Sequence, residues 1–187
     1  LERDASGAEL YTAEIVYPKD REKLLLSWEA MKKENPGDYG FHYAPYNFDS
    51  NPEKNFFEQM LVQLNMKPDE VEDVYFTGAI TDPAKTDFYV EYKDDKGKMR
   101  RYTPDFVIRR KPKQGGKPGS GRVVIVEIKR EYDRAHPVDG DTGRKAMALR
   151  KWEKLNPDRL KYQMIFTSTD TVSADQVQEV RRAVDEG

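Results

Sequence analysis

The 187-residue chain contains no cysteine and only two histidines, His42 and His136. Disulfide bonds, thiolate metal sites and cysteine nucleophiles are therefore excluded, and a site built from several histidines is not expected. No apolar run approaches the ~20 residues that a membrane-spanning helix needs. We expect a soluble, cytoplasmic protein without a membrane partner, whose chemistry depends on carboxylates, lysines and hydroxyl groups.

A strong net charge is also missing, because 32 Lys and Arg face 34 Asp and Glu, for a formal charge of −2. The charges are nevertheless segregated along the chain. Residues 1–95 contain 10 basic and 21 acidic side chains, whereas residues 96–134 contain 13 basic and 4 acidic ones. A basic segment can attract a polyanion even when the total charge is near zero. From charge alone, a solvated hairpin and loop is the alternative interpretation.

The hydrophobic pattern predicts a mixed α/β fold with a central sheet flanked by helices. Strand-forming residues occupy 9–17, and a one-sided apolar pattern predicts a helix over 21–33 with Asp20 as its N-cap. A helix is expected from Pro52 to about Asn65, with Asp49, Ser50 or Asn51 as its cap. The remaining expected elements are strands at 71–80, 87–93, 99–109, 123–128 and 162–167, a hairpin turn at 94–97, and helices at 142–155 and 174–184.

These elements predict one compact domain over residues 38–187 and an N-terminal strand–helix extension over residues 1–37. Within the domain, the predicted order is a helix, three strands, a further buried strand, a helix, a strand and a last helix. Strands that alternate with helices in this way indicate one layered sheet.

Two polar interruptions in strand-like sequence are candidates for chemistry. Asp105 follows Pro104, whose missing N–H places it at a sheet edge, at a bulge or at the start of a strand. Glu127 and Lys129 lie two residues apart in VVIVEIK, so they project to one side of the strand and Ile128 to the other. Such charges are costly to bury unless they are paired or bound to a metal. The simpler interpretation is an edge aspartate and a surface ion pair.

If these two strands are neighbours, Asp105 and Glu127 could bind one hard cation, with the Ile128 carbonyl pointing into the same space. Mg²⁺ is the expected ion, because it prefers oxygen ligands and keeps several waters. Lys129 could then orient a metal-activated water or stabilise charge that develops on a phosphate.

A third carboxylate is expected from the helix over residues 52–65. Glu53 lies one turn before the apolar stripe that begins at Phe56, so it shares the buried face of that helix. Glu58 lies at the rim of the stripe and is the second choice. Compensation of the helix dipole is the structural alternative for Glu53.

At this point the residues resemble a known family. Thr103-Pro104-Asp105 and Glu127-Ile128-Lys129 on successive strands look like the PD-(D/E)XK nuclease signature, with Glu53 in the position of its N-terminal helix acid. The order of predicted elements is similar to the α-β-β-β-α-β order of that restriction-endonuclease-like core. Residues 48–169 most resemble the C-terminal endonuclease domain of type III restriction enzyme Res subunits and related helicase-linked nucleases, through FDSNPEKNFFEQML, TDFYVEYKDDKGKMRRYTPDF, VVIVEIK, RKAMALRKWEKLN and KYQMIFT.

The resemblance implies a DNA endonuclease that depends on Mg²⁺, for which Mn²⁺ can substitute, and that leaves 5′-phosphate and 3′-hydroxyl ends. It implies metal binding by Asp105, Glu127 and the Ile128 carbonyl, with Lys129 and Glu53 as further catalytic groups. It also implies a helicase or translocase motor elsewhere, since the chain has no GxxxxGK[ST] motif. The candidate DNA ligands are the basic residues around the acids, namely Arg100, Arg101, Arg109, Arg110, Lys111, Arg130 and Lys145.

Two other functions remain open from the sequence. The first is a non-catalytic DNA-binding or interaction module on the same fold, in which the acids are kept for structure. The second is a transposase-type or repair nuclease of the same superfamily, which shares the chemistry but not the partners. For Lys145, a solvated helix face is an equal alternative to DNA binding.

Overall fold

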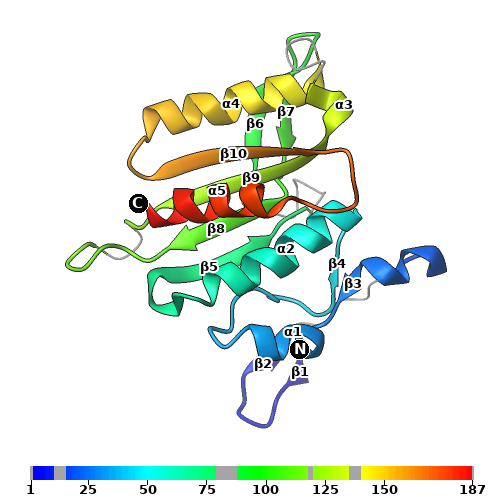
Figure 1. Cartoon of the computed structure of the whole chain (residues 1–187), viewed down its shortest axis with the longest axis vertical. Coiled ribbons are helices and arrows are strands. Elements are labelled where there is room, and N and C mark those ends of the chain that lie inside the picture. Colours follow the sequence, from blue (N-terminus) through cyan, green and yellow to red (C-terminus); the bar gives the residue numbers. More distant parts are fainter. Residues whose placement is uncertain (1, 11–15, 79–87, 118–119, 135–139, 187) are drawn as a thin grey trace.

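A four-stranded mixed β-sheet forms the centre of the computed structural model, which describes residues 2–10, 16–78, 88–117, 120–134 and 140–186 (Figure 1). The strand order across the sheet is β10-β9-β8-β5. β9 is antiparallel to β8 and parallel to β10, and β8 is antiparallel to β5. The four strands are β5 (Val71–Phe76), β8 (Phe106–Arg110), β9 (Val123–Arg130) and β10 (Leu160–Thr167). The predicted α/β class with a mixed central sheet is confirmed.

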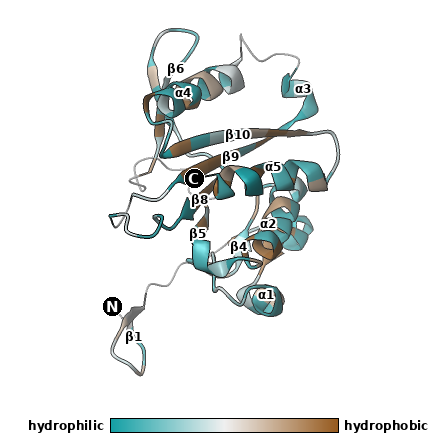
Figure 2. Cartoon of the chain, turned by 60° about the vertical axis from the view of Figure 1, so that its left-hand side comes forward, coloured by the Kyte–Doolittle hydropathy of each residue, from teal (hydrophilic) through white to brown (hydrophobic). Residues whose placement is uncertain are grey.

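Helices cover both faces of this sheet. On one face α2 (Asn51–Leu64) and α5 (Ala174–Asp185) pack against the side chains of Val124, Val126 and Ile128. On the other face α4 (Asp141–Leu155) covers Ile125. The alternation along β9 therefore divides the apolar core into two parts, and Figure 2 shows the hydrophobic colour concentrated on the inner strands and on the inner side of α2.

A separate β-hairpin is inserted between β5 and β8. It consists of β6 (Val90–Lys93) and β7 (Met99–Tyr102), which pair only with each other, and β6 packs against α4. Its turn contains Gly97 with a φ of 76°, as the Asp-Lys-Gly sequence predicts. The single strand expected over 99–109 is wrong, because the chain leaves the hairpin before Pro104 and enters the central sheet only at Phe106.

The N-terminal helix expected over residues 21–33 is also wrong. That segment forms a 3₁₀-helix, a two-residue strand that pairs with β4, and a short helix that Ser27 caps by accepting from the Ala30 N–H. A new cap within the apolar pattern starts a new helix, so the one-sided pattern does not continue as one element. The elements are η1 (Lys19–Leu24), β3 (Leu25–Leu26), α1 (Trp28–Met31), η2 (Lys32–Glu34) and β4 (Tyr46–Asn47).

The boundary expected after residue 37 falls within the packed region. Leu26 and Met31 belong to the same core cluster as the α2 side chains. Of the strand expected over residues 9–17, the structure describes β2 (Glu9–Leu10), which pairs with β1 (Glu2–Arg3); residues 11–15 lie outside the described part of the chain.

The other helical segments are short and lie at the ends of the sheet. They are η3 (Pro68–Glu70), which precedes β5, and α3 (Glu131–Arg134), which follows β9. Across the described ranges, no helix is both long enough and apolar enough to cross a bilayer.

Candidate active site

The two carboxylates predicted from the sequence meet at one end of the β8–β9 pair. The antiparallel register places Phe106 opposite Val126, so that Asp105 lies opposite Glu127. The Ile128 N–H donates a hydrogen bond to Asp105 Oδ2 at 2.7 Å. The expectation that these strands are neighbours is confirmed, and Asp105 is anchored directly to the Glu127-Ile128-Lys129 segment.

Pro104 explains why the ladder is open at this point. At the far end of the β8–β9 pair, the Arg110 N–H donates to the Arg122 carbonyl at 2.8 Å. In an antiparallel ladder, every second pair of opposite residues exchanges hydrogen bonds in this way. This periodicity places Ile128 opposite Pro104, which has no N–H to donate to the Ile128 carbonyl. Because the N–H and C=O of one strand residue point to the same edge, the Ile128 carbonyl faces the side on which Asp105 lies.

Lys129 lies between the two acids. Its Nζ is 2.8 Å from Glu127 Oε1 and 4.0 Å from Asp105 Oδ2. Burial raises the pKa of both carboxyls, and the Lys129 charge opposes that rise. Burial on its own lowers the pKa of Lys129, but the charge of Glu127, followed by that of Asp105, raises it above its ordinary value. The pKa values of the three groups therefore depend on one another. The groups lie where little water reaches them, since Glu127 is only 2% exposed.

Glu53 is held in the first turn of α2 by the sequence that starts the helix. Ser50 is the N-cap, and its hydroxyl accepts from the Glu53 N–H and donates to Glu53 Oε1 at 2.8 Å. Glu53 Oε2 accepts from the Asp49 N–H at 3.0 Å. Burial, followed by the negative charge of Asp105, raises the pKa of Glu53 to about 7. Glu53 is thus anchored to the start of α2 and is a close electrostatic neighbour of Asp105. Glu58 lies further along α2 and lines no part of the cavity described below.

The raised pKa of Glu53 predicts a pH-dependent cost to stability. A protonated Glu53 side chain stabilises the fold relative to the ionised one. This contribution to stability is fully present below the unfolded pKa near 4.5 and is lost as pH rises through about 7. We therefore expect Glu53→Gln to be more stable than the wild type at pH 8, by at most about 3 kcal/mol, and to lose this advantage near pH 4.5. Urea unfolding at both pH values measures the difference; an advantage that does not depend on pH would contradict the assignment.

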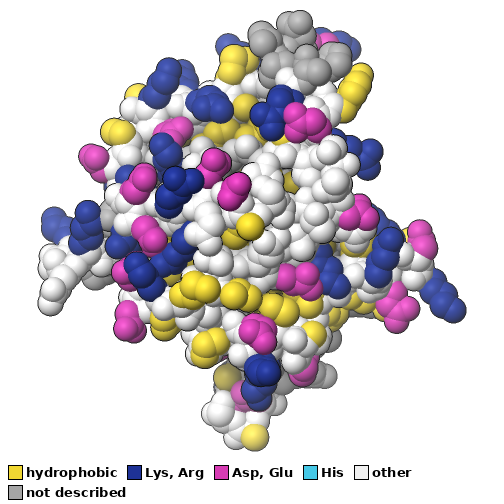
Figure 3. Space-filling view, viewed as in Figure 1, with side chains coloured by type: hydrophobic (Ala, Val, Ile, Leu, Met, Phe, Trp, Pro, Cys, Tyr) yellow, Lys and Arg dark blue, Asp and Glu magenta, His cyan; other side chains and the backbone are white. Residues whose placement is uncertain are grey.

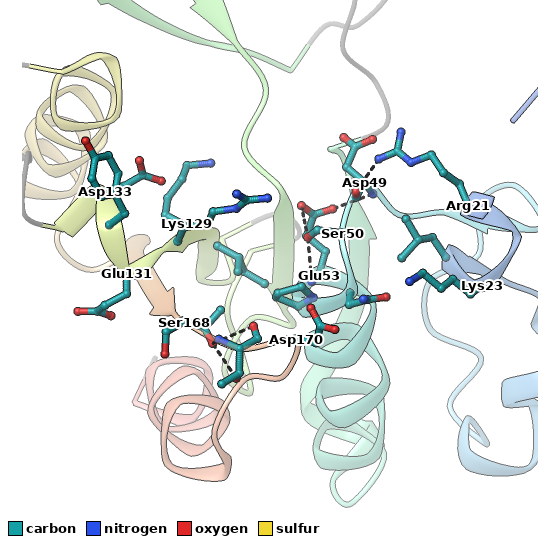
Figure 4. A pocket seen from close by; sticks show the side chains of 18 of the residues that line it. Arg21, Lys23, Asp49, Ser50, Glu53, Lys129, Glu131, Asp133, Ser168 and Asp170 are labelled. Carbon is teal, nitrogen blue, oxygen red and sulfur yellow. Dashed lines mark hydrogen bonds between the residues drawn. The ribbon is translucent and has the colours of Figure 1, made fainter. Parts of the chain in front are cut away.

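A cavity of about 1070 Å³ opens beside Glu53 and Lys129 (Figure 4). The sequence did not indicate most of its lining, because the residues come from segments far apart in the chain. η1 contributes Arg21 and Lys23, and Asp49, which the sequence indicated only as a possible helix cap, lies at its edge. The lining residues are Asp20, Arg21, Lys23, Leu24, Asp49, Ser50, Asn51, Pro52, Glu53, Ile128, Lys129, Arg130, Glu131, Tyr132, Asp133, Thr167, Ser168, Thr169 and Asp170.

Two of the seven basic candidates lie near the carboxylates. Arg130 lines the cavity. Lys145 Nζ is 2.8 Å from Asp141 and 5.1 Å from the centre of the Tyr102 ring. Its charge, after that of Lys129, also opposes the rise in pKa that burial causes at Asp105 and Glu127. Lys145 is therefore part of the electrostatic environment of the site and not only a solvated helix residue.

The other five basic candidates lie elsewhere. Arg100 and Arg101 lie on the hairpin and pair with Asp94 at 2.8 Å and Glu91 at 3.1 Å. Arg109, Arg110 and Lys111 lie at the opposite end of β8 from Asp105. Figure 3 shows Lys and Arg mixed with Asp and Glu over the face that presents α4, without one continuous basic area on that face.

Arg110 contacts the C-terminal end of α5. Its guanidinium donates to the Asp185 carbonyl at 2.6 Å and to the Val184 carbonyl at 3.3 Å, both in the last turn of α5. Cations at a helix C-terminus stabilise its carbonyls. We expect Arg110→Ala to lower the free energy of unfolding by about 1–3 kcal/mol and to leave DNA affinity unchanged. Urea unfolding and a DNA-binding titration test this; weaker DNA binding with unchanged stability would reverse the assignment.

The oxygen atoms at the β8–β9 end fit a hard cation. Among the described residues there is no group of three or more His, Cys, Asp or Glu side chains that could hold a metal, so the possible ligands are two carboxylates and a backbone carbonyl. Glu127 Oε2 is buried and accepts no hydrogen bond from the described residues. A buried acceptor without a donor is costly, and Mg²⁺ binds such an oxygen while keeping waters in its other positions. The residues present therefore suit Mg²⁺ or Mn²⁺.

Comparison of the chain with protein-family models, with curated proteins and with solved structures found no match.

Proposed function

We propose that this protein is a metal-dependent DNA endonuclease domain of the PD-(D/E)XK type, which hydrolyses phosphodiester bonds. The observation that carries the proposal is the meeting of Asp105, Glu127 and Lys129 at one desolvated strand end, with Asp105 bonded to the Ile128 N–H. The chain order α2, β5, β8, β9, α4, β10 and the sheet order β10-β9-β8-β5 support a restriction-endonuclease-like core, into which the β6–β7 hairpin is inserted.

Each residue has a distinct role in this proposal. Asp105, Glu127 and the Ile128 carbonyl would hold the metal. A bound Mg²⁺ lowers the pKa of a coordinated water and neutralises charge on the phosphate. Lys129 would orient the attacking water and stabilise negative charge at the phosphate, because its Nζ lies beside both carboxylates. Glu53, with its pKa of about 7, can exchange a proton near neutral pH.

The wider assignment rests on the resemblance of the sequence. The proposed substrate is DNA, and the proposed partner is a helicase or translocase motor in the full-length protein or complex, as in the nuclease domains of restriction enzymes. A transposase-type or repair nuclease would use the same residues with other partners, and the sequence that flanks this chain in its gene separates these assignments.

A non-catalytic module is the second candidate, and one observation favours it. Lys129 already pairs with Glu127 at 2.8 Å, and such an ion pair can be kept for structure alone. Calorimetric titration with Mn²⁺ distinguishes the two candidates. Binding that requires Asp105 and Glu127 supports the nuclease, whereas no such binding supports the module.

Plasmid nicking tests the proposed activity directly. The chain is incubated with supercoiled DNA in Mg²⁺, in Mn²⁺, in Ca²⁺ and in EDTA. We expect nicking in Mg²⁺ and Mn²⁺ and none in EDTA. The proposal would be wrong if nicking were equal in all four conditions, since a metal-independent activity cannot come from this site.

A further inference from the structure

The cavity beside the proposed active site has two walls of different origin. η1, with Arg21 and Lys23, forms one wall, and the start of α3, with Glu131 and Asp133, forms the other (Figure 4). The loop after β10 closes the cavity on a third side with Ser168 and its neighbours. Lys129 and Glu53 lie between the walls, so anything bound in the cavity is adjacent to the proposed catalytic groups.

The size of the cavity restricts what can occupy it. Pockets of about 300–1,000 Å³ enclose one drug-sized ligand. A cavity of about 1070 Å³ is therefore large enough for a short piece of one strand. The groove is also confined to one side of the sheet end, between η1 and α3.

The lining has the chemistry of a single-strand site. Such sites combine cations along the backbone path with aromatic rings on which bases stack. The cations are Arg21, Lys23, Lys129 and Arg130. Tyr132 supplies a ring, and its side chain is 74% exposed at the cavity wall. Ser168 and Thr169 add hydroxyl groups that are exposed beside them.

The carboxylates in the lining determine how strong the binding can be. Six carboxylates line the same cavity, so the cations do not form a uniformly positive surface; they are Asp20, Asp49, Glu53, Glu131, Asp133 and Asp170. Arg134 pairs with Glu131 at 2.5 Å and offsets one of these charges. Stacking must then contribute much of the affinity, and the four cations limit the slope of log affinity against log salt to about −3.

We propose that this cavity binds an unpaired DNA strand, with one base stacked on Tyr132 and the adjacent phosphate directed toward Lys129 and Glu53. The inference rests on the proposed function for the identity of the nucleic acid. It adds a substrate class, because the strand to be cut must be single-stranded or locally unpaired where it enters the cavity. A motor that separates strands would supply such a substrate.

Fluorescence anisotropy in Ca²⁺ tests the inference without cleavage. The probes are a labelled oligo-dT and a labelled blunt duplex of equal length. We expect oligo-dT to bind at least tenfold more tightly than the duplex. We also expect Tyr132→Ala to weaken oligo-dT binding by about 5- to 100-fold, because stacking on an aromatic ring contributes that much per base. Tyr132→Phe keeps the stacking face and should bind within twofold of the wild type.

Trp152→Ala is the matched control, since Trp152 is 39% exposed on α4 and lies outside the cavity. It should leave oligo-dT binding unchanged. Duplex binding equal to or tighter than oligo-dT binding would overturn the inference, and so would a loss of less than twofold in Tyr132→Ala. Failure of the nuclease proposal is seen separately, in the absence of cleavage of oligo-dT in Mg²⁺ and Mn²⁺ by a protein that still binds oligo-dT.

Discussion

Asp105→Asn is expected to abolish Mn²⁺ binding and to reduce Mg²⁺-dependent cleavage at least 100-fold, while the fold remains intact. The amide oxygen of asparagine can still accept the hydrogen bond that the Ile128 N–H donates to Asp105 at 2.7 Å. The neutral amide is a poor ligand for a hard cation and removes one of only two carboxylates at the strand end. Calorimetry with Mn²⁺ and plasmid nicking measure the two effects.

The stability of the same variant provides an internal check. Burial raises the pKa of Asp105, so the wild type bears a cost of ionisation that asparagine does not. The variant should therefore unfold at an equal or higher urea concentration at pH 8. Asp158→Asn, an exposed aspartate outside the cavity, is the control and should change neither metal binding nor cleavage. Full Mn²⁺ affinity in Asp105→Asn would refute the metal site.

Lys129→Ala is expected to cost about 3–5 kcal/mol of unfolding free energy near neutral pH, because it leaves Glu127 buried without its partner. The cost should shrink toward pH 5. Burial raises the pKa of Glu127, and without the Lys129 charge the carboxyl takes up a proton more readily as pH falls. Urea unfolding in EDTA at pH 5 and pH 8 measures this difference.

A double variant separates the structural role of Lys129 from its proposed catalytic role. Glu127→Gln with Lys129→Met replaces the ion pair by neutral groups of similar size and should recover most of the lost stability. It should not recover cleavage, since it has neither the metal ligand nor the ammonium. A stable but inactive double variant supports the nuclease; cleavage that returned with stability would mean that Lys129 acts only through folding.

Local patterns predicted several elements correctly. A capping residue within 49–51, the proline in the first turn and the apolar stripe beginning at Phe56 mark α2, and the structure has the helix from Asn51 to Leu64 with Ser50 as its cap. The hairpin turn at residues 94–97 and the continuous apolar run of β9 were recognisable for the same reason. In these cases residues close in sequence determine the backbone conformation, through caps, turn geometry and side-chain periodicity.

Predictions failed where a distant segment decided the conformation. Leu25 fits a helical stripe, but Leu25 and its neighbour Leu26 pair with Asn47 and Tyr46 as a strand. Arg110 belongs to a basic cluster in the sequence, yet its guanidinium caps α5, more than 70 residues away. Neither partner can be read from local sequence, because the pairing depends on how the chain returns across the sheet.

The sequence by itself determined the kind of chemistry open to this protein. Without cysteine and with two histidines, it leaves carboxylates and lysines, and strand alternation alone places Glu127 and Lys129 on one side. Only the tertiary structure decided which groups meet. The β8–β9 register brings Asp105 to Glu127, the packing of α2 brings Glu53 near them, and η1 and α3 enclose the cavity. The physical reason is that charge and burial act through space, so the pKa and partner of each group depend on contacts between distant parts of the chain.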